Sequence, residues 1–195
     1  MISRKLQAAI AALVLAIFAM GGYLVHLKRK AESITSPPET GALTAPLSGP
    51  SEQMVLYLAN DADDSLQTIS VSSALPGDPG ERGRYALHTL IARYLQKDSA
   101  HPLGPVADVH DVYLLDPSSA VVNLNAAFAD AHRSGIEVEQ LSVFSVVLTL
   151  KSQLPQLARV RFLVDGKARE TLAGHIDLAS WYDVGAVASA AAELK

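Results

Sequence analysis

The sequence contains no cysteine, and this absence excludes several kinds of site before any motif is considered. Without thiols the chain can form neither a disulfide nor a thiol nucleophile, and most structural zinc sites are excluded as well. Lipoprotein processing also needs a cysteine after the leader, so we do not expect a lipid anchor. The absence of cysteine does not select a redox compartment.

The sequence also lacks a recognisable active site. The acidic group Asp61, Asp63 and Asp64 has neither the glycine nor the final glutamate of an EF-hand loop, so we interpret it as a solvated turn. Four histidines have no neighbouring ligand at metal spacing, and we interpret them as structural or exposed: His88, His101, His110 and His132. We therefore predict no metal and no cofactor.

The charge is divided unevenly along the chain. Five of the 16 basic residues and none of the 20 acidic residues fall in the first thirty positions, so residues 31–195 carry 11 − 20 = −9. An acidic domain is repelled by nucleic acid, and a nucleic-acid partner is therefore not expected.

The amino terminus predicts a membrane anchor. Residues 8–25 carry no charge, and residues 6–27 are long enough to span a bilayer as a helix behind a short cytoplasmic tail at 1–5. A cleaved signal peptide is the alternative, although its apolar core is usually shorter. Basic residues flank both ends, so charge alone does not set the orientation. Residues 28–53, with four prolines, predict a linker.

The strongest pattern predicts a long apolar helix that begins after Gly135 and is stopped by Pro155. Glu137 and Glu139 near its start and Lys151 near its end give the charge order that a helix dipole favours. Because apolar residues cover most of its circumference, we expect burial on several sides. Solvent exposure is the simpler interpretation of its remaining polar stripe, and close packing against another helix is the alternative: Ser142, Ser145, Thr149 and Ser152.

The remaining patterns predict an α+β domain over residues 54–183, with a mixed sheet and two helices packed on one face, followed by an alanine-rich tail at 184–195. The apolar run at 54–60 favours a central strand. Alternation after residue 158 predicts a strand with Arg159 and Arg161 facing outward. The expected order is β-β-α-β-β-α-β, with strands near 54–60, 66–72, 109–115, 120–124 and 159–164 and helices near 81–98 and 136–154.

A family resemblance rests on the end of this domain. Leu-Pro-x-Leu at 154–157 follows the long helix, then Val-Arg-Phe-Leu-Val-Asp-Gly-Lys at 160–167 and Thr-Leu-Ala-Gly-His-Ile-Asp at 171–177. Together with the first strand, the 85–95 helix and Val-Val-Asn-Leu-Asn at 121–125, these residues resemble the GerMN domain of sporulation and spore-germination proteins. The resemblance covers about residues 54–178.

The resemblance implies a fold similar to the ring-building folds of secretion and sporulation complexes, tethered to a membrane and without known enzymatic activity. No catalytic residue can be carried over from it. The family often has an aspartate at the position of Asn123, so any role of that carboxylate is in doubt for this chain.

Two classes of function follow. The first is a non-enzymatic scaffold or interaction module on the outer side of the cytoplasmic membrane, in contact with other envelope proteins or with itself through Arg159, Arg161 and Arg169. Those arginines could equally protect a strand edge from aggregation. The second is a small envelope enzyme or ligand-binding domain with a site near His175 and Asp177, which would require a polar pocket there. No small-molecule substrate is evident.

Overall fold

The computed structural model describes residues 50–194 of the chain. The anchor predicted at residues 6–27 and nearly all of the linker predicted at 28–53 lie outside the described residues. Among the helices of residues 50–194, none combines the length and the apolar content needed to cross a bilayer.

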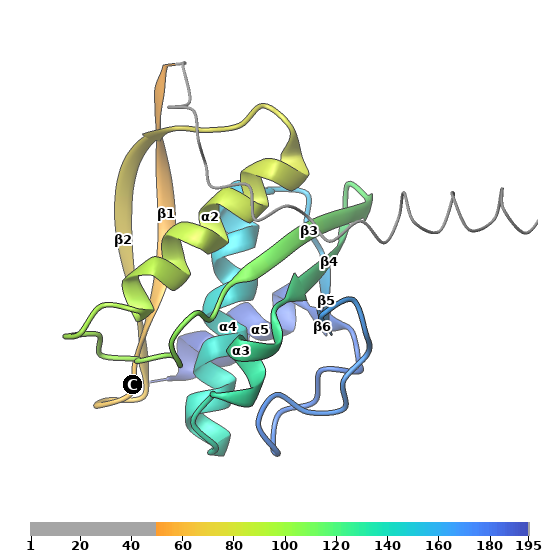
Figure 1. The fold of residues 1–195 in the computed structure, drawn as a ribbon. Coiled ribbons are helices and arrows are strands. Elements are labelled where there is room, and N and C mark those ends of the chain that lie inside the picture. Colours follow the sequence, from red (N-terminus) through yellow and green to blue (C-terminus); the bar gives the residue numbers. More distant parts are fainter. Residues whose placement is uncertain (1–49, 195) are drawn as a thin grey trace, which may run out of the picture. The chain divides into compact units, whose positions relative to one another are not determined.

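The described residues form six strands and four helices, and these elements pack in layers (Figure 1). Their order is β1 (Ser51–Asn60), β2 (Ser65–Ala74), α2 (Pro79–Tyr94), β3 (Val109–Asp116), β4 (Ser119–Leu124), α3 (Ala126–Asp130), α4 (Ile136–Gln153), β5 (Arg159–Val164), β6 (Tyr182–Asp183) and α5 (Val184–Glu193).

The strands form two separate sheets. β1 and β2 pair as an antiparallel hairpin, whereas β3, β4, β5 and β6 form a mixed sheet in which only the β4–β5 pair is parallel. Figure 1 shows α2 and α4 between the hairpin and the mixed sheet. The predicted α+β class, with two helices on one face of a mixed sheet, is confirmed. The prediction that residues 54–60 form a central strand is wrong, because β1 belongs to a two-stranded hairpin.

Helix α4 is the centre of the domain, as its apolar circumference predicted. It contacts β1, α2 and α5, and Val143 and Val146 line an internal gap together with Leu124 and Phe162 of the mixed sheet. Twelve of its eighteen residues are buried. A helix enclosed by other elements on several sides has no wet face, and this explains why its apolar residues are not confined to one stripe.

The polar stripe of α4 seals the free edge of β1. Thr149 Oγ1 accepts a hydrogen bond from the Tyr57 N–H at 3.0 Å, and the hydroxyls of Ser145 and Ser152 donate to the carbonyls of Tyr57 and Val55 at 2.6 and 2.7 Å. Ser145 and Thr149 are fully buried. The interpretation of this stripe as solvent-exposed is therefore wrong. Three of its hydroxyls bind β1, Ser145 also contacts the Tyr94 hydroxyl of α2 at 2.5 Å, and Ser142 is buried against two histidines. The hydroxyls replace the neighbouring strand that β1 lacks.

Three short elements lie outside the expected order β-β-α-β-β-α-β. Residues 126–130 form α3, whose Phe128 is buried, and β6 pairs with β5 near residue 159. Within the segment predicted as an alanine-rich tail, residues 184–193 form α5. The side chains of Val184 and Val187 are buried, and the helix packs against α4. The core of the domain is thus completed by segments with weak sequence patterns.

Candidate functional site

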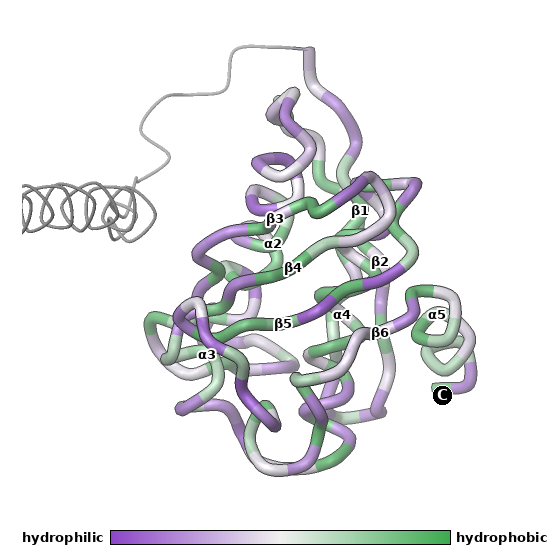
Figure 2. The backbone as a smooth tube through the Cα atoms, turned by 90° about the vertical axis from the view of Figure 1, so that its right-hand side faces the viewer, coloured by the Kyte–Doolittle hydropathy of each residue, from purple (hydrophilic) through white to green (hydrophobic). Residues whose placement is uncertain are grey.

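The side of the mixed sheet that faces away from α2 and α4 is the candidate site, and we call it the outer face (Figure 2). On β5, Val160, Phe162 and Val164 are buried against the helices. Because side chains alternate along a strand, Arg159 and Arg161 lie on the opposite side, as the sequence predicted. The outer face comprises Tyr113, Val121, Arg159, Arg161 and Leu163, and it is adjoined by Trp181 and by Leu115, which is exposed at the register shift near the end of β3.

Arg159 is held at one end of the outer face. Its Nε donates a hydrogen bond to Ser119 Oγ at 2.8 Å, and its guanidinium carbon lies 4.8 Å from the centre of the Trp181 ring. A guanidinium at this distance is attracted to the face of an indole ring. Arg159 also lies opposite Asp183 in the β5–β6 register. This arginine therefore contacts Ser119 on β4 and Trp181 just before β6.

Arg161 lies in the middle row of the outer face. The strand registers align it with Val121 of β4 and, through Val121, with Tyr113 of β3. Its Nε is buried and has no hydrogen-bond partner within the described part of the chain. Buried donors in folded proteins are nearly always paired, so this nitrogen is an exception that calls for an explanation.

Large apolar side chains are exposed beside these arginines. Tyr113 is 48%, Leu115 63% and Trp181 36% exposed. Tyrosine, tryptophan and arginine are the side chains most enriched where proteins bind one another tightly. The sequence could predict the direction of the arginines from the alternation in β5, but the strand registers were needed to show which side chains surround them.

Arg169, the third arginine predicted for a contact surface, has a different environment. It lies in the loop after β5, where its Nη1 is 2.5 Å from Asp130 Oδ1 and its Nε donates to the Thr171 carbonyl at 3.0 Å. The structure therefore places Arg159 and Arg161 together on one face and gives Arg169 a local ion pair instead.

His175 belongs to a carboxylate site that the sequence did not predict. Glu139 is fully buried, and its Oε2 accepts hydrogen bonds from the N–H groups of Ala173, His175 and Ile176 at 3.0–3.1 Å. Its Oε1 accepts from the Gly135 N–H at 3.2 Å and from His175 Nδ1 at 2.9 Å. Burial acts to raise the pKa of Glu139, but the donors, led by the Ile176 N–H, outweigh it and lower the pKa to about 2.

The structure does not join His175 and Asp177 into an acid–base pair. While His175 binds Glu139, the Asp177 carboxylate accepts a hydrogen bond from the Ala179 N–H at 2.7 Å. The Ser180 side chain and the Ala179 N–H lower the pKa of Asp177. The two carboxylates therefore stabilise neighbouring parts of one segment: Glu139 holds the loop at 173–176, and Asp177 holds the turn that follows it.

A second buried polar cluster lies around Ser142, about one helical turn along α4 from Glu139. His101 Nδ1 is 2.5 Å from Asp61 Oδ1, and Nε2 of both His101 and His132 is 2.6 Å from Ser142 Oγ. Arg133 Nη1 pairs with the second oxygen of Asp61 at 2.6 Å. Burial lowers the pKa of both imidazoles, an effect that Asp61 opposes at His101 and the Arg133 carbonyl opposes at His132.

This cluster has the order of a Ser–His–Asp triad but not its accessibility. His101 and Ser142 are each 1% exposed, and the internal gap beside Ser142 has no room for a water molecule. A nucleophile must reach its substrate, so a buried serine cannot act as one here. The cluster instead ties four segments together. Its contacting pairs are 10 to 72 residues apart in the chain, and no local pattern could have predicted their contact.

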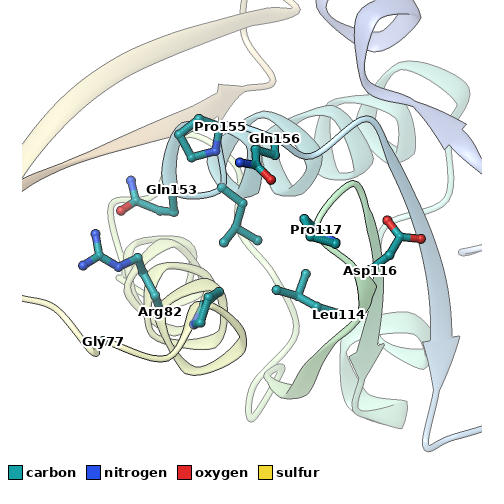
Figure 3. A pocket seen from close by; sticks show the side chains of 10 residues that line it. Gly77, Arg82, Leu114, Asp116, Pro117, Gln153, Pro155 and Gln156 are labelled. Carbon is teal, nitrogen blue, oxygen red and sulfur yellow. The ribbon is translucent and has the colours of Figure 1, made fainter.

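A cleft of about 690 Å³ lies at the far end of the domain, between the start of α2, the β3–β4 turn and the end of α4 (Figure 3). Arg82, one of its lining residues, is already bound by Glu52 in a bidentate ion pair and by the Pro76 carbonyl. Asp116 accepts hydrogen bonds from Ser118. The charged groups of the cleft are therefore occupied by neighbours. Neither His175 nor Asp177 lines it.

Asn123, where the family often has an aspartate, also has a structural role. Its side chain is buried, and its Oδ1 accepts a hydrogen bond from the Gly166 N–H at 2.7 Å. Asp165 and Gly166 both have positive φ, at 48° and 72°, so they form the tight reversal that the Asp-Gly pair predicted. An amide can serve this turn as well as a carboxylate.

Comparison with known proteins identifies the class of this domain. The family model "Germane: Sporulation and spore germination" matches residues 55–170, and the chain belongs to this family. The GerMN resemblance drawn from the motifs at 154–177 is thereby confirmed. No curated protein matches the chain.

Three solved structures are similar to this chain at low identity. A candidate lipoprotein from Clostridium perfringens is 17% identical, with a TM-score of 0.45 over 73% of this chain and 93% of that one. The tandem GerMN domains of the sporulation protein GerM from Bacillus subtilis are 19% identical, with a TM-score of 0.45 over 67% of this chain and 45% of that one. The first GerMN domain of that protein alone is 18% identical, with a TM-score of 0.44 over 66% of this chain and 94% of that one. The family assignment rests on the family model.

Proposed function

We propose that this protein is a non-enzymatic interaction module of the bacterial cell envelope, held at the cytoplasmic membrane by residues 6–27, with its folded domain on the outer side. Its contact surface is the outer face of the mixed sheet. One observation carries the proposal: Tyr113, Leu115 and Trp181 are exposed there beside two arginines in an otherwise acidic domain.

The environment of the polar groups supports a role without catalysis. The triad-like serine at 142 is sealed, and the carboxylate of Glu139 is saturated by hydrogen bonds from its own chain. Both clusters link segments of the fold and present no free group to a substrate. Family membership is consistent with an envelope role, and the uncharged run at 8–25 supports a membrane anchor.

Site-specific photo-crosslinking of the full-length protein in intact cells tests the contact surface. A photoreactive residue in place of Leu115 beside the outer face is compared with the same residue in place of Gln67, which is exposed on β2 of the hairpin. We expect one dominant protein adduct at position 115 and none at 67. Equal labelling at both positions would refute an outer-face interaction.

Protease treatment of cells with permeabilised outer layers tests the location. Digestion of the domain that leaves a membrane-bound stub is the expected result. A protected domain would place it in the cytoplasm and refute the envelope proposal, and a soluble intact domain before protease is added would instead identify residues 1–30 as a cleaved signal peptide.

A further inference from the structure

We propose, on the basis of the function proposed above, that the outer face binds an acidic segment of a different polypeptide. A carboxylate of the partner pairs with the Arg161 guanidinium, and apolar side chains next to it contact Tyr113 and Leu115. The proposed function locates the contact surface, and the acidic segment is the chemistry of the partner that binds there.

Arg161 differs from the arginines of the described chain that form ion pairs. Arg82, Arg84, Arg133 and Arg169 each form an ion pair with a carboxylate of their own domain. Within residues 50–194 no such pair is formed by Arg161, and its Nε is buried without an acceptor. A guanidinium is a rigid planar donor that matches a carboxylate through two parallel hydrogen bonds. Because Nε itself is sealed while the side chain as a whole is half-buried, an incoming carboxylate would pair with the terminal Nη groups of the guanidinium.

The acidic residues around the outer face are committed elsewhere. Asp111 accepts a hydrogen bond from the Tyr113 hydroxyl at 3.0 Å, and Asp116 accepts two from Ser118. Asp183 caps α5 by accepting from the Ala186 N–H at 2.7 Å. These carboxylates keep their charge, but their hydrogen bonds hold them in place, and within residues 50–194 none of them forms an ion pair with Arg161.

The surroundings of Arg161 favour a polypeptide over a purely anionic polymer. Tyr113 and Arg161 are two strands apart, about 10 Å, with the aliphatic Val121 between them. An extended peptide presents side chains at a comparable spacing and can place an apolar group and a carboxylate on one side. A polyanion without apolar groups would leave Tyr113 and Leu115 uncovered.

The test uses the full chain in detergent and three matched fluorescent decapeptides. In the acidic peptide pairs of glutamates alternate with pairs of apolar residues (valine, leucine or tyrosine), so that each side of the extended chain carries both kinds of side chain. In the controls glutamine or lysine replaces every glutamate. Fluorescence anisotropy gives Kd at low and high salt for the parent chain, for Arg161→Gln and for Arg169→Gln. The last variant removes an arginine that lies off the outer face and is paired with Asp130.

We expect the acidic peptide to bind the parent chain about tenfold more tightly than the glutamine peptide, with a preference that weakens at high salt. Arg161→Gln should abolish the preference, whereas Arg169→Gln should keep it. Equal binding of the acidic and glutamine peptides, or an equal loss in both variants, would overturn the inference.

The crosslinking experiment separates the two proposals. A protein adduct at position 115 together with no preference for the acidic peptide would leave the interaction surface standing and refute the partner chemistry. An adduct that consists of a second copy of this chain would also refute the inference, because the carboxylates would then come from the acidic domain itself. No adduct at position 115 would refute the proposed function.

Discussion

Replacing Glu139 by glutamine should destabilise the domain in a strongly pH-dependent way. The carboxylate is fully buried and receives five hydrogen bonds, which lower its pKa from 4.5 to about 2. A depressed pKa means that the folded state favours the ionised group more than the unfolded state does. The resulting stabilisation is complete above pH 4.5 and is lost as the pH falls toward 2.

The size of this effect follows from the pKa difference. Because the pKa falls from 4.5 to about 2, the ionised carboxylate stabilises the folded state by about 3–4 kcal/mol at neutral pH. The hydrogen bonds lost on substitution lead to a similar free-energy cost. A glutamine oxygen could still accept from Ala173, His175 and Ile176, but its NH₂ group would then face the N–H of Gly135. One unsatisfied buried donor and the loss of a charge-assisted site together cost about 2–4 kcal/mol.

Urea unfolding followed by the fluorescence of Trp181, the single tryptophan, measures this difference. Glu137→Gln is the matched control, since Glu137 lies in the same helical turn but is exposed. We expect Glu139→Gln to lower the free energy of unfolding by about 3 kcal/mol at pH 7. The difference in this free energy between the variant and the parent chain should become smaller toward pH 2.5. A gap that stays constant with pH, or that equals the effect of Glu137→Gln, would refute the reasoning.

Three further substitutions test the packing of the domain by the same unfolding assay. Thr149→Val keeps the shape of the side chain but removes the acceptor of the Tyr57 N–H, so we expect a loss of about 1–3 kcal/mol; a neutral result would show that this edge of β1 does not need the hydroxyl. Phe162→Ala should cost about 3–5 kcal/mol because the ring is 1% exposed, and a loss below about 1 kcal/mol would contradict its place in the core. Gly104→Ala would place a Cβ 2.3 Å from that of Ala131, so we expect a loss of about 1–3 kcal/mol, and an unchanged midpoint would mean that the loop moves freely.

The local elements of this fold could be predicted because short-range physics decides them. Alternation placed Phe162 inside and Arg161 outside, Asp165 and Gly166 form the expected reversal, and α4 ends before Pro155. Each of these depends on residues within a few positions of one another, through strand geometry, turn conformation or the missing N–H of proline.

The polar groups of α4 show where such reasoning failed. The stripe at 142–152 has the spacing of a wet helix face, and only the position of β1 reveals that its hydroxyls serve a strand edge. Glu139 carries the charge expected in a first helical turn, yet it is buried because the loop at 173–176 supplies N–H donors. A side chain is assigned to water or to the core by partners that are far away in the sequence.

The sequence by itself determined the class of the domain, its main helix and strands, the acidic balance of the chain, the run of apolar residues at its start and the family motifs at its end. The tertiary structure decided that the strands divide into two sheets with helices between them. It also decided that Asp61, His101 and Ser142 form a sealed cluster, and that Arg161, without a carboxylate partner among residues 50–194, lies on the same open face as Tyr113. These outcomes depend on contacts between residues 40 or more positions apart, which arise only when the layers pack and which no local periodicity encodes.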